Sequence, residues 1–261
     1  MTGGSAVRWD PAAYLRVADE RARPFHDLLA RVGAAAPRRV VDLGCGPGTL
    51  TVDLARRWPD AAVTGLDSSP EMVAAARAAG VSATTGDVTD WTPGPADDVV
   101  VCNAVLQWVP GHLDLVRRWA SALTPGGWLA FQVPGNFAAP SHVAIRTLAA
   151  DPRWAGRLGG LLRDEDAVHE PAVYAEALAA AGLAVDVWET TYLHRLTGED
   201  PVLTWVTGTA LRPVRTILDD DEWAAFTTEV APRLRADYPP AADGTTWFPF
   251  RRILAVAHRA P

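Results

Sequence analysis

Apolar residues recur along the first half of the chain in short strand-like runs that alternate with segments of helical periodicity. Five runs rich in apolar and β-branched residues are expected to be buried strands: 38–43, 62–66, 82–85, 98–103 and 128–133. Apolar residues at three- and four-residue spacing predict helices at 49–57, 70–79 and 112–123. This alternation is typical of βαβ units, and it predicts an α/β fold with a parallel sheet.

The flanking segments are mainly helical in pattern. Helices are expected at 12–19 and around Pro24, and in the second half at 144–149, 171–181 and over most of 201–234. Two further strands are expected at 184–192 and 251–258. The chain, 1–261, is therefore predicted to be one domain. Its cofactor-binding core would lie at 38–133, with helical cap elements over a substrate pocket at 1–37, about 137–181 and 195–247.

Composition and net charge limit the kinds of partner that the protein is expected to bind. The formal net charge of −7 argues against nucleic acid as a main partner, because phosphate binding requires a basic face. No apolar run approaches the roughly 18 residues of a membrane span, and the first ten residues lack the features of a signal peptide. The two cysteines, Cys45 and Cys102, lie in core-like segments without metal-ligand spacing. We expect a reduced, cytoplasmic protein without a membrane partner or a metal, either a monomer or a weak homodimer.

A glycine-rich segment, Gly44-Cys45-Gly46-Pro47-Gly48, follows the first predicted strand and precedes a helix. Glycine permits tight turns and close approach of a ligand to the backbone, and the N–H groups of a helix N-terminus favour a polar or anionic ligand. Asp67 ends the second strand about twenty residues further on, where a carboxylate can accept both hydroxyls of a ribose. These features predict a ligand containing adenosine, and they do not choose between NAD and S-adenosylmethionine (SAM).

Two positions favour SAM. Thr49 stands where a dinucleotide fingerprint needs its third glycine. Asp42 would repel a pyrophosphate, whereas its charge suits a ligand with ammonium and sulfonium centres. Asp87 follows the third strand, where it could accept the adenine amino group, and Asn103 closes the fourth strand beside the expected cofactor. Simple capping of strand ends is the alternative role for Asp67 and Asp87.

The glycine loop, the two acids and the turn at 123–127 resemble those of the class I SAM-dependent methyltransferases. The flanking motifs are similar to the trans-aconitate 2-methyltransferase family over almost the whole chain, with no firm motif between 152 and 170. The matching segments are 9–15, 20–24, 66–72, 103–108, 132–136, 190–194 and 205–213. The resemblance implies a doubly wound, mostly parallel seven-stranded sheet with helical lid insertions. It also implies cofactor contacts from Cys45, Gly46, Ser68, Met72 and Val88.

The same resemblance implies methyl transfer from SAM to a carboxylate of trans-aconitate, giving a monomethyl ester and S-adenosylhomocysteine. Carboxylates have an ordinary pKa near 4 and are already ionised at neutral pH, so no general base is required. The absence of a convincing Ser/His/Asp or Cys/His arrangement in the sequence agrees with such a reaction.

A substrate with three negative charges should meet arginines, because a guanidinium makes planar, bidentate contacts with carboxylates. The candidates are Arg23, Arg146, Arg212, Arg251 and Arg252. Arg212 is favoured because the stretch around it is otherwise uncharged, and Arg23 could instead hold the methionyl carboxylate of SAM. Arg251 and Arg252 precede the last strand, so alternation allows at most one of them to face the pocket.

Four ring side chains are further candidates for contact with the substrate, namely Tyr14, Trp108, His142 and Trp205. Packing in the core, or exposure in the case of the histidine, is the alternative for each. The acidic run at 219–222 is interpreted as a solvated helix start rather than a metal site.

Three alternative functions remain open at this stage. A SAM-dependent enzyme could act on another small acid or on a natural-product hydroxyl, and a hydroxyl would need a base near Trp108. The glycine loop could belong to an NAD(P) oxidoreductase, against which Thr49 and Asp42 argue. A regulator that binds SAM without catalysis is the third alternative.

Overall fold

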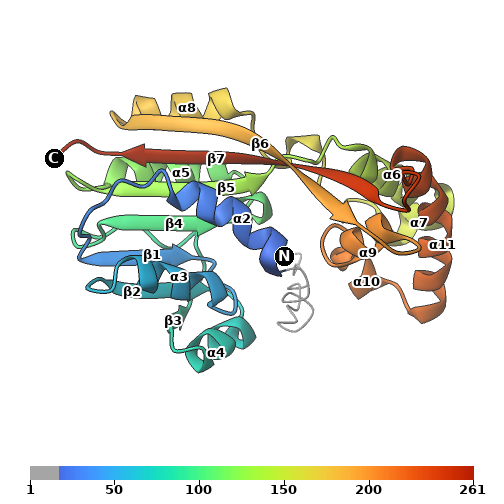
Figure 1. Ribbon diagram of the computed structural model, residues 1–261, viewed down its shortest axis with the longest axis horizontal. Coiled ribbons are helices and arrows are strands. Elements are labelled where there is room, and N and C mark those ends of the chain that lie inside the picture. The colour runs from blue at the N-terminus through green and yellow to red at the C-terminus, as the bar shows by residue number, and fades with distance from the viewer. Residues whose placement is uncertain (1–17) are drawn as a thin grey trace. The chain divides into compact units, whose positions relative to one another are not determined.

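The computed structural model describes residues 18–261, and these fall into two compact units (Figure 1). The sheet unit contains the described residues up to Pro134, together with Val168–Thr190 and Arg252–Pro261. The helical unit contains Gly135–Ala167 and Thr191–Arg251. Tyr14 and most of the helix expected at 12–19 lie outside the described residues. The single-domain organisation and the cap role of the helices stay predictions.

Seven strands form one sheet in the order β3-β2-β1-β4-β5-β7-β6. Neighbouring strands from β3 to β5 are parallel, and β7 is antiparallel to β5. The strand bounds are β1 (Arg39–Leu43), β2 (Ala62–Asp67), β3 (Ser82–Thr85), β4 (Val99–Asn103), β5 (Trp128–Pro134), β6 (Ala184–Leu196) and β7 (Thr246–His258). The predicted α/β fold with a mostly parallel, seven-stranded sheet is confirmed.

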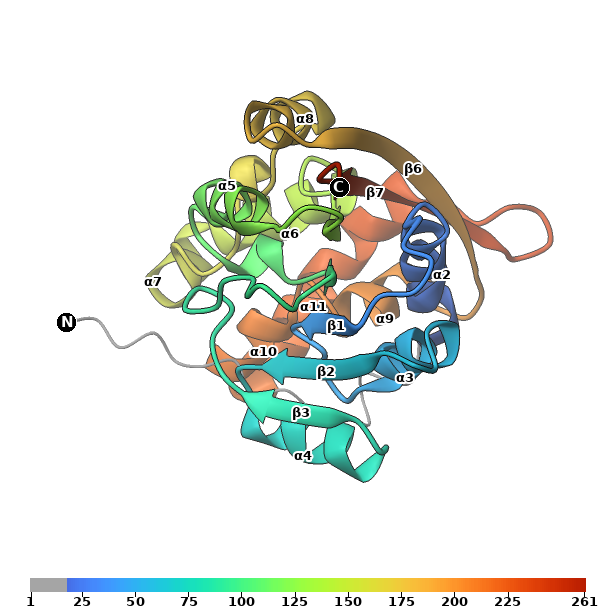
Figure 2. The ribbon, with the colours of Figure 1, turned by 90° about the vertical axis from the view of Figure 1, so that its left-hand side faces the viewer.

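Helices cover both faces of this sheet, as the doubly wound fold requires (Figure 2). One face packs against α5 (His112–Ala122) and α8 (Pro171–Ala180), and the other packs against α2 (Ala18–Leu29) and α3 (Thr49–Arg57). The alternation of side chains along β1 explains this division, since Val41 belongs to the first core and Val40 to the second. A smaller cluster holds α4 (Pro70–Ala78) near β3, and the hydroxyl of Ser69 caps α4 by accepting the N–H of Met72.

The helical unit contains five α-helices among its described residues, in the region where the sequence predicts a mainly helical pattern. They are α6 (Pro140–Ala149), α7 (Pro152–Leu158), α9 (Pro201–Thr207), α10 (Arg212–Ile217) and α11 (Asp220–Asp237). Asp219 caps α11 and forms a reciprocal capping box with Glu222. The acidic run at 219–222 is thus a helix start.

Helix α8 falls within the range assigned to the cap, and in the structure it packs on the sheet, where Tyr174 and Leu178 complete the core beside α5. Two sequence-based element boundaries are wrong for physical reasons. Strand β7 begins at Thr246 rather than at 251, and its buried and exposed residues alternate from Thr246 to Phe250 as the pleat of a strand requires. Helix α6 begins at Pro140 rather than at 144, since proline suits the first turn of a helix.

Over the residues that the structure describes, no helix is both long and apolar enough to cross a bilayer.

Tyr174 links α8 to α5 within the sheet unit. Its buried hydroxyl lies 2.7 Å from Nε2 of His112 and accepts a hydrogen bond of 3.2 Å from the backbone N–H of His169. Tyr174→Phe should lower the free energy of unfolding by about 1–3 kcal/mol, because two buried polar groups lose their partner. Urea titration measures this loss. Leu193→Ala is the control, since Leu193 is 56% exposed and should change stability by only about 0.5 kcal/mol. An unchanged urea midpoint for Tyr174→Phe would contradict the role of this hydroxyl.

Candidate active site

The glycine loop turns sharply where β1 ends. The backbone N–H groups of Gly44 and Cys45 both donate to the carbonyl of Leu66, at 2.7 and 3.0 Å. Gly44 has a φ of 72°, and a Cβ atom built there would lie 2.2 Å from Cγ2 of Val105. Gly48 precedes α3 with a φ of 81° and no side-chain cap. The loop therefore requires glycine at Gly44, and it leaves the N–H groups at the start of α3 without a side-chain acceptor at the N-cap.

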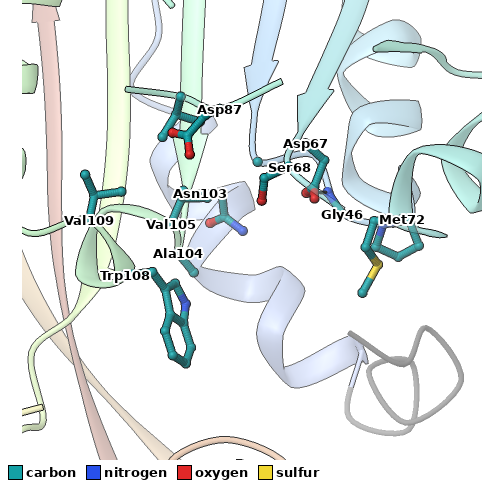
Figure 3. A pocket seen from close by; sticks show the side chains of 13 residues that line it. Gly46, Asp67, Ser68, Met72, Asp87, Asn103, Ala104, Val105, Trp108 and Val109 are labelled. Carbon is teal, nitrogen blue, oxygen red and sulfur yellow. Dashed lines mark hydrogen bonds between the residues drawn. The ribbon is translucent and has the colours of Figure 1, made fainter. Parts of the chain in front are cut away.

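A pocket opens beside this loop at the carboxyl ends of the parallel strands (Figure 3). Its cavity volume is about 210 Å³. The carboxyl edge of an open parallel sheet is the usual ligand site of such folds. The pocket is lined by Gly44, Gly46, Pro47, Asp67, Ser68, Met72, Asp87, Val88, Asn103, Ala104, Val105, Trp108 and Val109.

Asp67 joins two parts of the pocket wall. One carboxylate oxygen accepts the N–H of Gly46 at 2.8 Å, and the other accepts the N–H of Ser69 at 2.9 Å. Each carboxylate oxygen has a second lone pair, so Asp67 can still accept hydrogen bonds from a ligand in the pocket. Its two proposed roles, holding the strand end and binding a ligand, are therefore compatible.

Asp87 and Asn103 complete the polar part of the pocket. Oδ1 of Asp87 accepts the backbone N–H and the hydroxyl of Thr89, at 2.8 and 2.7 Å. Oδ1 of Asn103 accepts a hydrogen bond of 2.7 Å from Nε2 of Gln132. Figure 3 shows Asp87 and Met72 far apart in the pocket with Asn103 between them, and the side chain of Met72 adds apolar surface.

Asp42 and Cys45 were predicted to contact the cofactor, but neither lines the pocket. Asp42 is 3% exposed and accepts a hydrogen bond of 2.6 Å from the hydroxyl of Thr51. Burial raises its pKa to about 6, and raises the pKa of the Cys45 thiol to about 12. Both residues support the loop from behind, because their side chains point into the packed layer between strand and helix.

Two predicted arginine contacts also lie outside this lining. Arg23 is exposed on α2, and Arg252 is buried on β7, where its guanidinium donates to Oε1 of Gln132 at 3.3 Å. Alternation along β7 does not indicate that Arg252 would contact Gln132 on the neighbouring strand β5. Arg251 lies in the helical unit and donates to the carbonyl of Gly135.

Four lining residues were not predicted by sequence reasoning, namely Pro47, Ala104, Val105 and Val109. Ala104 has a φ of 56°, a conformation that non-glycine residues adopt rarely, and it starts the turn that leads to the short helix η1 (Leu106–Trp108). Trp108, a predicted substrate contact, lies on the pocket wall formed by this turn. No residue-type signal marked Ala104, since alanine is not typical of a left-handed turn.

Two predicted substrate contacts lie close together within the helical unit. His142 is near Asn136 and Ser141, and burial together with the charges of Arg146 and Arg163 lowers its pKa to about 4. Arg146 donates to the carbonyl of Phe137 at 2.6 Å and pairs with Asp164 and Glu165. Two arginines thus lie near a neutral imidazole, and two acids offset the charge of Arg146.

Trp205 and Arg212 are the other two candidates in the helical unit. Trp205 is 6% exposed and stacks on His194, with ring centroids 4.4 Å apart, beside Phe248 and Phe250. Arg212 is half-buried at the first turn of α10. Contact of either residue with a substrate stays a prediction.

Residues 18–261 contain no group of three or more His, Cys, Asp or Glu side chains arranged to hold a metal ion.

Comparison with known proteins defines the class. Residues 40–127 match the family model described as a methyltransferase domain. The fold is similar to that of the YcgJ protein from Bacillus subtilis, with a TM-score of 0.58 at 15% identity, covering 92% of this chain and 99% of that one. It is also similar to an S-adenosylmethionine-dependent methyltransferase from Mesorhizobium loti, with a TM-score of 0.51 at 21% identity, covering 92% and 98% of the two chains.

Closer relatives narrow the class to one family. The chain is 60% identical to the trans-aconitate 2-methyltransferase of Rhodococcus jostii (strain RHA1), over 95% of this chain and 98% of that protein. It is 57% identical to the trans-aconitate 2-methyltransferase of Mycobacterium tuberculosis (strain ATCC 25177 / H37Ra), over 95% and 96%. The chain therefore belongs to the trans-aconitate 2-methyltransferase family. This membership decides against the dehydrogenase alternative.

Gly44→Ala tests the tight approach between the loop and Val105. The added methyl group should cost about 1–2 kcal/mol through the left-handed backbone, and a further 1–3 kcal/mol or so through overpacking. Gly80→Ala is the matched control, because Gly80 has a φ of 87° and a Cβ there would meet nothing within 4 Å. Chemical denaturation should show a clearly larger loss for Gly44→Ala, and equal losses for the two variants would contradict the close approach.

Asp42→Asn tests the buried carboxylate. A folded-state pKa of about 6 lies above the unfolded value, so the folded protein binds the proton more tightly and the free energy of unfolding falls as pH rises from about 4 to 6. Asparagine does not titrate. The stability of Asp42→Asn relative to the parent protein should therefore rise over this pH range, by up to about 3 kcal/mol. Urea titrations at a series of pH values measure the difference, and parallel pH curves would contradict the raised pKa.

Proposed function

We propose that this protein is a SAM-dependent O-methyltransferase that methylates a carboxylate of trans-aconitate. The products are a monomethyl ester and S-adenosylhomocysteine. The observation that carries this proposal is the 60% identity, over 95% of the chain, to a protein named for that activity. We also expect the protein to be cytoplasmic and either a monomer or a weak homodimer.

The pocket of the sheet unit supports SAM as the methyl donor. Asp67 offers carboxylate oxygens suited to the two ribose hydroxyls, and Asp87 offers an acceptor for the adenine amino group. The glycine loop allows a ligand to approach the backbone closely, since a Cβ at Gly46 would meet nothing within 4 Å on the protein side. Ser68, Met72 and Val88 supply the remaining surface for the adenosine part.

The reaction needs little proton chemistry from the protein. SAM supplies a methyl group on sulfur: as the carboxylate oxygen bonds to the methyl carbon, the sulfur–carbon bond breaks and its electron pair stays on the sulfur. The carboxylate is ionised before it binds, so no base is required. The protein contributes by orienting the acid in line with the methyl group, which can lower the barrier by roughly 7–11 kcal/mol, and by excluding water from the nucleophile.

Contacts with the acid are assigned to the predicted residues that remain. Trp108 lies on the pocket wall, where its ring would exclude water from the reacting end of the cofactor. Arg212, Arg146 and His142 supply cationic and polar groups in the helical unit, and Arg212 is the favoured carboxylate partner. Tyr14 and Trp205 complete the proposed set. Because Arg146 pairs with two acids, it can also act by holding the cluster around His142.

The activity is tested by incubating the purified protein with methyl-labelled SAM and an acid panel of trans-aconitate, cis-aconitate and isopropylmalate. Methyl transfer should be fastest to trans-aconitate, and alkali should release the label as methanol, because the product is an ester. A labelled product stable to alkali would show transfer to another atom. No transfer to any acid in the panel would favour the non-catalytic alternative.

Asp67→Asn tests the cofactor site. Loss of a charge-assisted contact with the ribose should weaken binding of S-adenosylhomocysteine by about 1.5–3 kcal/mol, which is roughly a ten- to hundredfold rise in Kd. Isothermal titration calorimetry measures the Kd. Asp90→Asn is the control, because Asp90 is exposed and outside the pocket lining. Equal affinities for both variants would refute the role given to Asp67.

A further inference from the structure

Asn103 and Ala104 form a corner of the pocket whose backbone is fixed by hydrogen bonds with other parts of the sheet unit. Ala104 adopts a φ of 56°, and the N–H of Ala104 donates to the carbonyl of Gln132 at 3.0 Å. The carbonyl of Ala104 accepts a hydrogen bond of 2.7 Å from Nε2 of Gln107. A strained backbone of this kind persists only where its surroundings fix it, and it is typical of functional sites.

Gln132 also bonds to the side chain of Asn103. It lies on β5, directly opposite Asn103 on β4, and it is 1% exposed. Its Nε2 donates to Oδ1 of Asn103 at 2.7 Å. This bond turns Oδ1 toward Gln132, so the NH₂ group of Asn103 points the other way and can donate to a ligand. In Figure 3 this nitrogen is turned toward the Gly46 side of the pocket.

The orientation of Gln132 is in turn set by Arg252. Arg252 is 8% exposed on β7, diagonally across the antiparallel pair from Gln132, and its Nη1 donates to Oε1 of Gln132 at 3.3 Å. A guanidinium has donors and no acceptor. The oxygen of Gln132 must therefore face Arg252, which turns the NH₂ group of Gln132 toward Asn103.

We infer that Arg252 and Gln132 are positioning residues that fix Asn103 as a hydrogen-bond donor to a carboxylate bound in the pocket. The three side chains form a directed chain of hydrogen bonds with a buried cation at one end and a donor at the other. Successive amide dipoles aligned on a cation favour an anionic acceptor at the far end. This inference rests on the proposed function, in which both the methionyl part of the cofactor and the substrate carry carboxylates.

Gln132→Glu reverses the direction of the hydrogen bond between residue 132 and Asn103. A glutamate beside Arg252 stays ionised and presents only acceptors, so the amide of Asn103 must turn over to donate to it, leaving Oδ1 facing the pocket. Asn103→Asp reaches the same end by another route, because it places a charged acceptor at the pocket without disturbing the buried pair. Both variants should repel a carboxylate.

The control is Gln107→Glu. Gln107 is also buried and bonds to the same corner, but through the carbonyl of Ala104 and not through the side chain of Asn103. This variant shows how a change at Ala104 alone affects ligand binding, because it leaves the hydrogen bond from Gln132 to Asn103 in place.

The experiment measures the Kd of S-adenosylhomocysteine, the Kd of 5′-methylthioadenosine, which lacks the amino-acid carboxylate, and the KM for trans-aconitate. Gln132→Glu and Asn103→Asp should each weaken one carboxylate-bearing ligand by roughly tenfold or more while leaving the methylthioadenosine Kd unchanged. A rise confined to the S-adenosylhomocysteine Kd assigns the carboxylate to the cofactor, and a rise confined to the KM assigns it to the acid. Gln107→Glu should not discriminate between the two nucleosides.

The inference is overturned if both variants leave all three constants unchanged, or if they weaken methylthioadenosine as much as S-adenosylhomocysteine. If Gln132→Glu does not fold, Asn103→Asp alone carries the test, because its side chain reaches the pocket. Failure of the parent protein to bind S-adenosylhomocysteine is a separate result, and it would overturn the proposed function instead.

Discussion

The carboxylate of Asp67 holds together the two turns on which the pocket depends. Its oxygens accept the N–H groups of Gly46 and Ser69, so the glycine loop after β1 and the turn that starts α4 share one anchor. The loop can reach this anchor only because Gly44 turns with a positive φ against Val105, where any side chain would collide. The glycine loop and the start of α4 are thereby fixed relative to one another within the sheet unit.

The buried carboxylate of Asp42, which lies under the glycine loop, is a second constraint and lowers the stability of the folded protein. Asp42 is buried, its carboxylate accepts a hydrogen bond from the hydroxyl of Thr51, and burial raises its pKa because the charged form is disfavoured away from water. A buried carboxylate beside a ligand pocket is typical of sites in which stability is given up for function. The hydrogen-bonded side chains of Arg252, Gln132 and Asn103 form a second polar group in the sheet unit. In this group the oxygen of each amide accepts a hydrogen bond from a donor on the neighbouring residue.

The residues proposed for the cofactor site could be predicted from the sequence because their signals are local. Glycines before a helix, an acid at a strand end and apolar runs at regular spacing follow from backbone geometry, and Gly44, Gly46, Asp67, Asp87 and Asn103 all line one pocket. Direction and burial could not be predicted. Alternation along β7 says that Arg251 and Arg252 point to opposite sides, but not that Arg252 meets Gln132 on a neighbouring strand. Asp42 was placed at the right strand end, but a sequence does not show that the following helix covers it, and its contact with the cofactor stays a prediction. The turn at Ala104 carried no signal in the sequence, because its conformation is fixed by hydrogen bonds with residues on two other elements.

The central claim is that a carboxylate oxygen of the acid attacks the methyl group directly, without a base and without activation of the acid. Labelling the carboxylates of trans-aconitate with heavy oxygen tests this claim most directly. The methyl ester should retain both labelled oxygens of the attacked carboxylate, and alkaline hydrolysis, which cleaves the acyl–oxygen bond, should release methanol carrying the label. Unlabelled methanol would show that the ester oxygen came from elsewhere, and it would contradict the account.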